Sequence, residues 1–441
     1  MPNHPPPPGP LTRRTLLAGS AAAAGLGLTG CGSLAVSLSD KTVVKQWNLL
    51  AGADGAIMTE MHGQFEAEHP DVDLQATTLG WGTPFYTRIV MGASGGNGAD
   101  VATAHVSRIK SLSPATLLDP FDLKEIEDAG LDPDAFPAEL WDKCFVDGEL
   151  YAIPLDTHAL VNYYNRSVCA EIGALNPDGT LLETTGVEDY FDVLRAAKEV
   201  TGQYGTSLDT FGGWRQFWAW YRQADGEMAF GDGDYEMDDA KALQSIEVMY
   251  RMAEEGLCPT FADGAQCAAN FENGAAGFVQ VGNWEITRFR AFSEAQGLDF
   301  SMTEMPDFFG NRRTQGDSHS FILPHHNSWD PEVRRATIEY VAYMLKNSLQ
   351  WGAGAGHTPA YLPVTESAEY QALEPNAEYS GVVDNVQLDP EVWFSGSGAR
   401  LFDEAGTVFQ QVYALALNPE EALALLKERI QDLVSLPNPV D

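Results

Sequence analysis

Residues 42–104 read TVVKQWNLLAGADGAIMTEMHGQFEAEHPDVDLQATTLGWGTPFYTRIVMGASGGNGADVATA, and this stretch decides the fold. It begins with a short β-branched run at 42–47, which is typical of a strand. The apolar residues Met58, Met61 and Phe65 then recur at helical spacing and predict a helix, which a proline ends.

The rest of this stretch repeats the alternation. Residues 72–76 alternate apolar and polar as in a strand, a helix is expected at 85–91, and a third apolar run occupies 100–104. The order strand, helix, strand, helix, strand predicts a parallel sheet covered by helices, an α/β fold.

Later segments continue the pattern. We expect strands at 151–155, 160–164 and 277–281, and helices at 187–200 and 240–255. Asp330 before Pro331 and Asn418 before Pro419 are typical of helix starts, each followed by a stripe of apolar residues.

The charge excludes several classes of function. The 441 residues include 63 Asp plus Glu against 26 Lys plus Arg, a formal net charge of -37. Such a surface repels nucleic-acid phosphates and anionic lipid heads, so neither is an expected partner. With 44% apolar residues the chain is nevertheless globular in composition, and its length predicts two domains.

The N-terminus has the layout of an export signal. Two arginines, Arg13 and Arg14, precede the short apolar stretch 16–28, which favours the twin-arginine route over a membrane span. Residues 1–30 are therefore expected to be a lipoprotein signal peptide and 31–41 a tether. Cys31 closes the lipobox-like Leu-Thr-Gly-Cys and would carry the lipid; the alternative is a soluble secreted protein with an incidental cysteine.

Removal of the signal makes the chain more acidic. It takes away two arginines and no acids, which leaves 63 acidic and 24 basic residues, a balance of -39. The four remaining cysteines would then face an oxidising compartment, where three pairings are open. A Cys258–Cys267 disulfide closes the shortest loop and is favoured, with free buried thiols as the alternative.

Signatures of catalysis are lacking in the sequence. It contains no Gly-x-Ser-x-Gly elbow, no phosphate-binding Gly-x-x-x-x-Gly-Lys and no His-Glu-x-x-His helix. The adjacent His325 and His326 would point to opposite faces of a strand, so they do not indicate a metal site. We expect no enzyme, no cofactor and no metal.

Tryptophan gives the strongest functional signal. Three of the ten, Trp81, Trp214 and Trp284, stand beside glycines in apparent loops. An indole face matches the C–H-rich face of a pyranose while polar neighbours bond its hydroxyls, which favours sugar binding. The alternative for each ring is that it caps a hydrophobic cluster.

An ordered set of segments carries a family resemblance. The segments are FEAEHPDV at 65–72, ADV at 99–101, LLDPFD at 117–122, DGELYAIP at 147–154, YYNR at 163–166, and FENGAAG at 271–277 followed by GNW at 282–284. They resemble family 1 of the extracellular solute-binding proteins, the maltose-binding-type sugar-binding lipoproteins of ABC importers. Arg166 and Gly277 depart from the usual pattern, as does the start of the helix after Glu183.

The resemblance implies a periplasmic-binding-protein-like fold of type II, with two α/β lobes joined by a hinge that the chain crosses three times. The crossings would fall near 156–158, 302–306 and 352–359. The N-terminal lobe would then contain 42–157 plus 306–352, and the C-terminal lobe 158–302 plus 358–441.

The resemblance also implies which residues bind the ligand. The first set is His105, Ser107, His158, Trp214, Gln216 and Trp284, to which Trp81 is added because of its loop position; a second, looser set is Asp54, Asp156, His357 and Arg400. His158 stands where the family often has an acid.

The implied function is capture of a sugar or oligosaccharide in a cleft between the lobes and its delivery to the transmembrane subunits of an ABC permease. The protein would be a monomer, anchored outside the cell membrane through Cys31. Alternatives left open are a polyol, amino sugar or polyamine as ligand, an extracytoplasmic glycosidase, and a sensor accessory.

Overall fold

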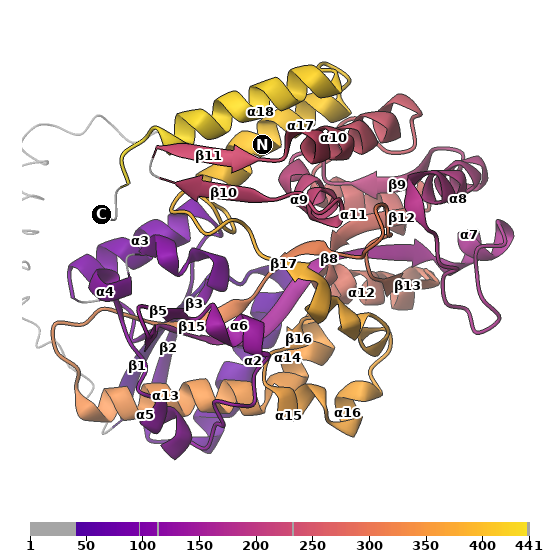
Figure 1. Ribbon diagram of the computed structural model, residues 1–441. Helices are drawn as coiled ribbons and strands as arrows, with labels where there is room; N and C mark the ends of the chain where they lie inside the picture. Colours follow the sequence, from indigo (N-terminus) through magenta and orange to yellow (C-terminus); the bar gives the residue numbers. More distant parts are fainter. Residues whose placement is uncertain (1–40, 97, 113, 232, 439–441) are drawn as a thin grey trace, which may run out of the picture. The chain divides into compact units, whose positions relative to one another are not determined.

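The computed structural model describes residues 41–96, 98–112, 114–231 and 233–438, drawn as a ribbon in Figure 1. The predicted signal peptide, Cys31 and all of the tether except Lys41 lie outside these residues.

The first sheet runs in the order β2-β1-β3-β15-β4, with β7 also paired to β15. Its strands are β1 Thr42–Asn48, β2 Val72–Thr78, β3 Val101–His105, β4 Leu118–Asp119, β7 Ala152–Pro154 and β15 His319–Pro324. β1, β2 and β3 are parallel, as predicted from the alternation of strands and helices. β15 comes from far later in the chain and is antiparallel to β3.

Helices with apolar stripes cover this sheet. They are α2 Gly52–Glu68, α3 Thr83–Ser94 and α13 Pro331–Lys346. In α2, Met58, Met61 and Phe65 are at most 1% exposed, as their spacing predicts. In α13, Asp330 accepts hydrogen bonds from the backbone N–H groups of Glu332 and Val333, which confirms its role as a cap.

Short elements complete this half of the structure. They are η1 Val106–Arg108, η2 Lys110–Leu112, α4 Pro114–Leu117, α5 Leu123–Asp128, α6 Ala138–Asp142, β5 Phe145–Val146, β6 Glu149–Leu150, α14 Ser348–Ala355 and α15 Leu362–Thr365.

The second sheet is organised around one long strand, β8 Asp156–Asn165, in the order β17-β14-β8-β12-β9. The other strands are β9 Tyr204–Leu208, β12 Ala276–Gly282, β13 Phe300–Thr303, β14 Thr314–Asp317, β16 Thr358–Pro359 and β17 Val386–Gln387. β12, β13, β14 and β16 all pair with β8 in antiparallel orientation.

Two separate hydrophobic cores cover the two faces of the second sheet. Leu160 and Tyr164 of β8 pack into one core, and Val161 and Tyr163 into the other, because successive side chains point to opposite faces. Helices on the first face are α8 Gly186–Thr201, α9 Gly213–Gln223, α10 Asp239–Glu254, α17 Arg400–Tyr413 and α18 Pro419–Val434. Those on the second are α11 Gly264–Glu272 and α12 Ile286–Gln296.

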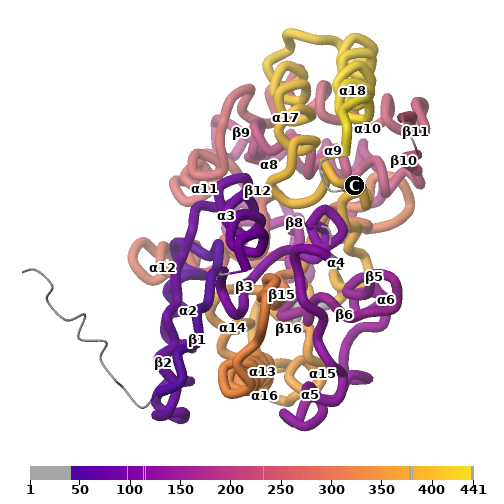
Figure 2. Tube along the Cα trace, turned by 90° about the vertical axis from the view of Figure 1, so that its left-hand side faces the viewer, coloured from indigo at the N-terminus to yellow at the C-terminus, as the bar shows by residue number. Residues whose placement is uncertain are grey.

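The remaining elements are α7 Arg166–Glu171, β10 Met228–Gly231, β11 Asp234–Met237, η3 Asn283–Glu285, α16 Ala368–Gln371 and η4 Asn376–Asn385. Figure 2 shows α17 and α18 at the opposite end of residues 42–438 from α13. Asn418 and Glu421 form a complete capping box at the start of α18.

The chain passes between the two sheets at points that differ in part from the expected ones. The first passage lies at Leu155, next to the predicted 156–158. The second was expected near 302–306, but the chain stays in the second sheet through β14 and joins the first only at His319. Met302 instead continues β13, opposite Tyr163.

The third passage begins within the predicted 352–359, because Thr358 and Pro359 pair with β8 of the second sheet. The chain then returns: Ala360, Tyr361 and Val364 pack into the core of the first sheet, and Tyr379 is the next residue buried against the second sheet.

The predicted Cys258–Cys267 disulfide is wrong. Cys144, Cys169, Cys258 and Cys267 are all free and buried. Cys258 packs into the core on one face of the second sheet and Cys267 into the core on the other. Proximity in sequence therefore did not bring the two thiols together.

None of the helices in the described part of the chain combines the length and apolar character that crossing a membrane requires.

The buried His62 of α2 makes the free energy of unfolding depend on pH. It is 7% exposed, and its Nε2 lies 2.9 Å from the hydroxyl of Tyr340. Burial lowers the pKa of His62 from 6.5 to about 4. The unfolded chain therefore takes up a proton on this residue below about pH 6.5 while the native chain does not, so stability is lost as the pH falls from about 6.5 to about 4.

We predict that His62→Gln removes about 2 to 3 kcal/mol of this acid sensitivity. The measurement is the free energy of unfolding in urea at about pH 7.5 and about pH 4.5. Thr59→Ala, on the exposed side of the same helix, changes no titratable group; it is the control and should retain the pH dependence of the wild type. An equal pH dependence in His62→Gln and wild type would contradict the prediction.

Candidate functional site

A cavity of about 370 Å³ lies where strand ends of both sheets meet. The wall comes from loops that follow β1, β2, β3, β9 and β12, and from β8, β14 and β15. Ligands of open α/β sheets bind outside the carboxyl ends of the strands. Its lining residues are Leu49, Leu50, Ala51, Asp54, Trp81, His105, His158, Asp209, Arg215, Gly264, Trp284, Gln315, Asp317, His319, His357 and Ser397.

Six of the residues named from the sequence line this cavity. From the first set these are Trp81, His105, His158 and Trp284, and from the second Asp54 and His357. The structure thus brings these aromatic and polar side chains together around one cavity, and their contact with a ligand stays a prediction.

The position of the Trp284 ring depends on Gly282, two residues before it. A Cβ on Gly282 would lie 2.2 Å from the Trp284 ring, so only glycine lets the indole lie against the backbone. Asn283 fixes the loop from the other side: its side chain donates to the Gly356 carbonyl at 2.8 Å and accepts from the Ala159 N–H at 3.2 Å. The Gly-Asn-Trp segment therefore ties the ring to β8 and to the residue before His357.

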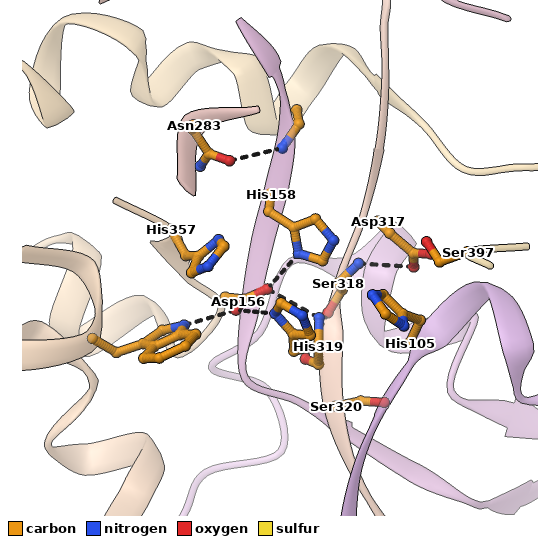
Figure 3. Close-up of polar contacts among 12 residues, drawn as sticks. His105, Asp156, His158, Asn283, Asp317, Ser318, His319, Ser320, His357 and Ser397 are labelled. Atoms are coloured by element: carbon orange, nitrogen blue, oxygen red, sulfur yellow. Dashed lines mark hydrogen bonds and ion pairs between the residues drawn. The ribbon is translucent and has the colours of Figure 1, made fainter. Parts of the chain in front are cut away.

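Asp156 lies directly beneath the wall and not on it. It is fully buried and accepts hydrogen bonds from His158 Nδ1 at 3.0 Å, His319 N at 3.0 Å, His319 Nδ1 at 2.8 Å and Trp351 Nε1 at 2.7 Å (Figure 3). One carboxylate thus orients two imidazoles and joins β8, β15 and α14.

Ser107 lies behind the wall and acts on it through Asp317. Its hydroxyl donates to Asp317 Oδ2, and Ser397 Oγ donates to the same oxygen at 2.7 Å. The Ser397 N–H in turn donates to Ser107 Oγ at 3.1 Å. This triad holds the segment after β3, the end of β14 and the loop before α17 together.

Trp214 and Gln216 do not line the cavity, and the loop interpretation of Trp214 was wrong. Both residues are 1% exposed in α9, and the Trp214 indole donates to Asp389 at 2.9 Å. Gly213 is the first residue of α9, and a Cβ there would lie 2.6 Å from the Phe409 side chain. The glycine thus marks close packing of α9 on α17 instead of a loop.

Arg400 lines a different hollow, together with Thr83, Tyr86, Arg108 and Trp393. It therefore stays outside the candidate site.

Sequence reasoning missed six polar residues of the wall, namely Asp209, Arg215, Gln315, Asp317, His319 and Ser397. A signal was present in the run Gly-Asp-Ser-His-Ser at 316–320, which is polar although it continues a strand. This polar run was not selected as part of the binding site, because the second passage between the sheets was expected earlier in the chain.

Arg215 brings a guanidinium among aromatic rings. Its guanidinium carbon lies 5.9 Å from the ring centroid of Trp81, 5.6 Å from that of Trp284 and 4.7 Å from that of Phe402. Burial lowers the pKa of Arg215 from its usual value. The cation therefore bridges the two tryptophans of the wall, and Trp81 itself remains 42% exposed.

The histidines of the wall differ in charge. Burial and the neighbouring His319 lower the pKa of His158 to about 4, and burial lowers that of His105 well below its usual value. Burial also acts to lower the pKa of His357, but the carboxylates of Asp156 and Asp54 outweigh it and raise that pKa. The pKa values of His158 and His105 are thus shifted toward the neutral imidazole, and that of His357 toward the charged form.

The ionisation of Asp156 follows from the same neighbours. Burial alone would raise its pKa, but the imidazoles of His319 and His357 and the hydrogen bond from His158 hold it well below the usual range. The carboxylate is therefore charged at neutral pH and can accept all its hydrogen bonds.

This arrangement suits binding more than catalysis. Along the described cavity wall, no serine, threonine or cysteine hydrogen-bonds to a histidine, and the hydroxyls of Ser107 and Ser397 are engaged with Asp317. What the wall offers is exposed aromatic area surrounded by fixed donors and acceptors.

Comparison with known proteins supports this interpretation. Residues 60–379 match the family model described as bacterial extracellular solute-binding protein. No curated protein matches the chain.

Solved structures of similar fold identify the fold class. The GacH receptor of Streptomyces glaucescens, solved unliganded and with acarbose, is 19% identical with a TM-score of 0.73, over 89% of this chain and 98% of that one. The Listeria monocytogenes substrate-binding protein Lmo0181, in complex with cycloalternan, is 16% identical with a TM-score of 0.73, over 90% and 100%. Maltose-bound MalE3 of T. maritima is 14% identical with a TM-score of 0.72, over 89% and 99%. The predicted fold class is confirmed.

We predict that Asp156→Asn lowers the free energy of unfolding by about 3 kcal/mol, because an amide cannot accept from all the donors that surround it. Urea unfolding at neutral pH measures the effect. Asp128→Asn, on the exposed surface of α5, is the control and should leave stability nearly unchanged. A stability of Asp156→Asn equal to that of the control would refute the orienting role of this carboxylate.

Proposed function

Because the chain belongs to the bacterial extracellular solute-binding proteins, we propose that it captures a sugar or oligosaccharide in the cavity between its two sheets and delivers it to the permease of an ABC importer. The proposal takes the ligand class from structures of similar fold, which are described with acarbose, cycloalternan and maltose.

One observation carries the ligand class. The rings of Trp81 and Trp284 stand on a wall whose polar groups include imidazoles, carboxylates and one guanidinium. A sugar ring needs this mixture, because its C–H face stacks on an indole while its hydroxyls need donors and acceptors on their edge. A purely apolar solute would leave the polar groups without partners.

Movement of the two sheets relative to one another is the second part of the proposal. We assign 42–155 and 319–364 to one lobe and 156–317 and 379–438 to the other, following the strand pairing and the cores. Closure around the solute would exclude water from its hydroxyls and create the form that docks on the permease as a monomer.

The charge of the wall restricts the solute. Asp54, Asp209 and Asp317 line the cavity, and Arg215 is the only arginine or lysine among its described lining residues. We therefore expect a neutral or cationic sugar, such as an amino sugar, and not a phosphorylated one.

Localisation follows from the N-terminal motif. We propose that a twin-arginine signal exports the chain and that lipid on Cys31 anchors it to the cell membrane, with the fold outside. Cys31→Ser should abolish incorporation of labelled palmitate by expressing bacteria, while Cys258→Ser should retain it. Labelling of Cys31→Ser at the wild-type level would exclude the anchor.

A thermal-shift screen of the purified protein tests the proposed function. A bound solute at about 100 times its dissociation constant stabilises the native state by about 3 kcal/mol. We expect stabilisation by one or more members of a panel of mono-, di- and oligosaccharides and amino sugars, without product formation. Products would indicate a glycosidase, and stabilisation by polyols or polyamines alone would overturn the sugar assignment.

Two tryptophan variants test whether the solute found in the screen binds in the cavity. Trp284→Ala should weaken binding of the solute found in the screen by roughly 1 to 3 kcal/mol, the usual loss for a stacked ring. It should leave the unliganded protein nearly as stable as the wild type. Trp214→Ala, in the core, should instead lower stability by about 3 to 5 kcal/mol. Unchanged affinity in Trp284→Ala would remove this ring from the binding site.

A further inference from the structure

A glycine-rich segment of the lobe of the second sheet lies against the lobe of the first sheet at the edge of the cavity. Residues 395–399, Ser-Gly-Ser-Gly-Ala, lead into α17, and we call this segment the strap. Its Ser397 lines the cavity, whereas Gly398 and Ala399 line the separate hollow that contains Arg400. The strap therefore borders both spaces.

Hydrogen bonds connect the strap to the other lobe. The Ser397 N–H donates to Ser107 Oγ at 3.1 Å, and Arg108 Nη1 donates to the Ser397 carbonyl at 3.1 Å. The Ser107 N–H donates to Asp317 Oδ1 at 3.1 Å. Asp317 lies beside Ser397 and accepts from its hydroxyl at 2.7 Å (Figure 3). Since Ser107 and Ser397 belong to different lobes, each of their N–H groups is bonded across the lobe boundary.

The backbone of the strap also approaches the other lobe so closely that side chains do not fit. A Cβ on Gly398 would lie 2.7 Å from Gly82 Cα. A Cβ on Gly396 would lie 2.7 Å from Arg108 Cδ and 2.9 Å from the Ser107 carbonyl oxygen. Non-bonded carbon atoms prefer separations of about 3.5 to 4.0 Å. The two glycines of the strap therefore permit a contact that exists only while the lobes are together.

Two other contacts between the lobes lie near the strap. The Trp81 ring meets Phe402 of α17 edge to face, with 6.1 Å between the centroids. Before the strap, Glu391 pairs with Lys110 and Lys143 of the other lobe. These ionic side chains are at least 37% exposed, and exposed pairs contribute little. The more buried contacts of the strap therefore matter more for closure than these ion pairs.

We propose that the strap locks the two lobes together through contacts in which the solute takes no part. The chain itself then supplies part of the free energy of closure, and the closed arrangement is populated before a solute binds. The apparent affinity for a solute that needs the closed arrangement rises in proportion to that population. The proposal rests on the lobe movement of the proposed function, but not on the identity of the solute.

Hydrogen exchange of the full-length protein without solute tests the lock. Mass spectrometry with electron-transfer fragmentation measures exchange at the single N–H groups of Ser107 and Ser397. Both should exchange at least about tenfold more slowly than the same amides in an unstructured peptide, because exchange requires separation of the lobes.

A strap variant and a matched glycine control test the cause of this protection. Gly398→Ala should speed exchange at Ser107, in the other lobe, about tenfold or more, because the added Cβ meets Gly82 only in the closed arrangement. Gly274→Ala is the control, since φ is +70° at Gly274 and +66° at Gly398, but a Cβ on Gly274 would have no described atom within 4 Å. It introduces the same left-handed strain and should exchange at Ser107 as the wild type does.

A second pair of variants keeps the test decisive if Gly398→Ala does not fold. Gly396→Ala should separate the lobes in the same way. Gly310→Ala is its control, because φ is +97° at Gly396 and +95° at Gly310, where a Cβ would have no described atom within 4 Å. Small-angle X-ray scattering should give a larger radius of gyration for each strap variant than for its control.

The proposal is overturned if the Ser107 and Ser397 amides of the wild type exchange as fast as in an unstructured peptide. It is also overturned if the strap variants match their controls in exchange at Ser107 and in radius of gyration. A wild type that no sugar stabilises in the thermal-shift screen contradicts the proposed function instead, and the exchange result stands on its own. For a solute that the screen finds, affinity should fall in Gly398→Ala by the same factor as the closed population.

Discussion

The carboxylate of Asp156 is the interaction on which the site depends. It is fully buried where the chain leaves the first sheet for the second, and all its acceptor capacity is used by His158, His319 and Trp351. A buried charge is tolerated only when its hydrogen bonds are complete. Any relative shift of β8, β15 or α14 would break at least one of these bonds. The charge therefore fixes the relative positions of three segments that sequence order keeps apart.

The polar character of the cavity follows from this constraint. Strands of both sheets end beside Asp156, and the groups at these ends point into the space between the sheets. Ser107, Asp317 and Ser397 form a second link of the same kind, and Asn283 forms a third between β8 and the segment before His357. Most cavity side chains are thus held by neighbours before a solute arrives, which reduces the entropy lost on binding.

The features of the fold that depend on local periodicity could be predicted from the sequence. The α/β alternation of 42–104, the buried stripe of α2 and the caps at Asp330 and Asn418 needed only neighbouring residues. Trp81, His105, His158 and Trp284 were found because each follows or begins a recognisable strand near a familiar segment. Cavity residues that lie next to a recognisable strand could therefore be predicted from the sequence.

Features that depend on long-range pairing were not predicted. His319 reaches the cavity only because β15 inserts beside β3, a choice that no local pattern reveals. Arg215 and Trp214 are neighbours on α9, yet one lines the cavity and the other lies in the core. The glycine at 213 indicated a loop, whereas it serves contact with Phe409 of α17. The Cys258–Cys267 pair failed for the same reason, since the two thiols pack into different cores.

The distribution of charged and aromatic groups within the cavity favours one orientation of a bound solute. Arg215 lies next to the rings of Trp81 and Trp284, and Asp54 lies next to His357. The first group offers aromatic faces and hydrogen-bond donors, while the second offers an imidazole backed by negative charge. A solute with an apolar ring face and electron-rich oxygens at opposite ends gains most when its face lies on the indoles.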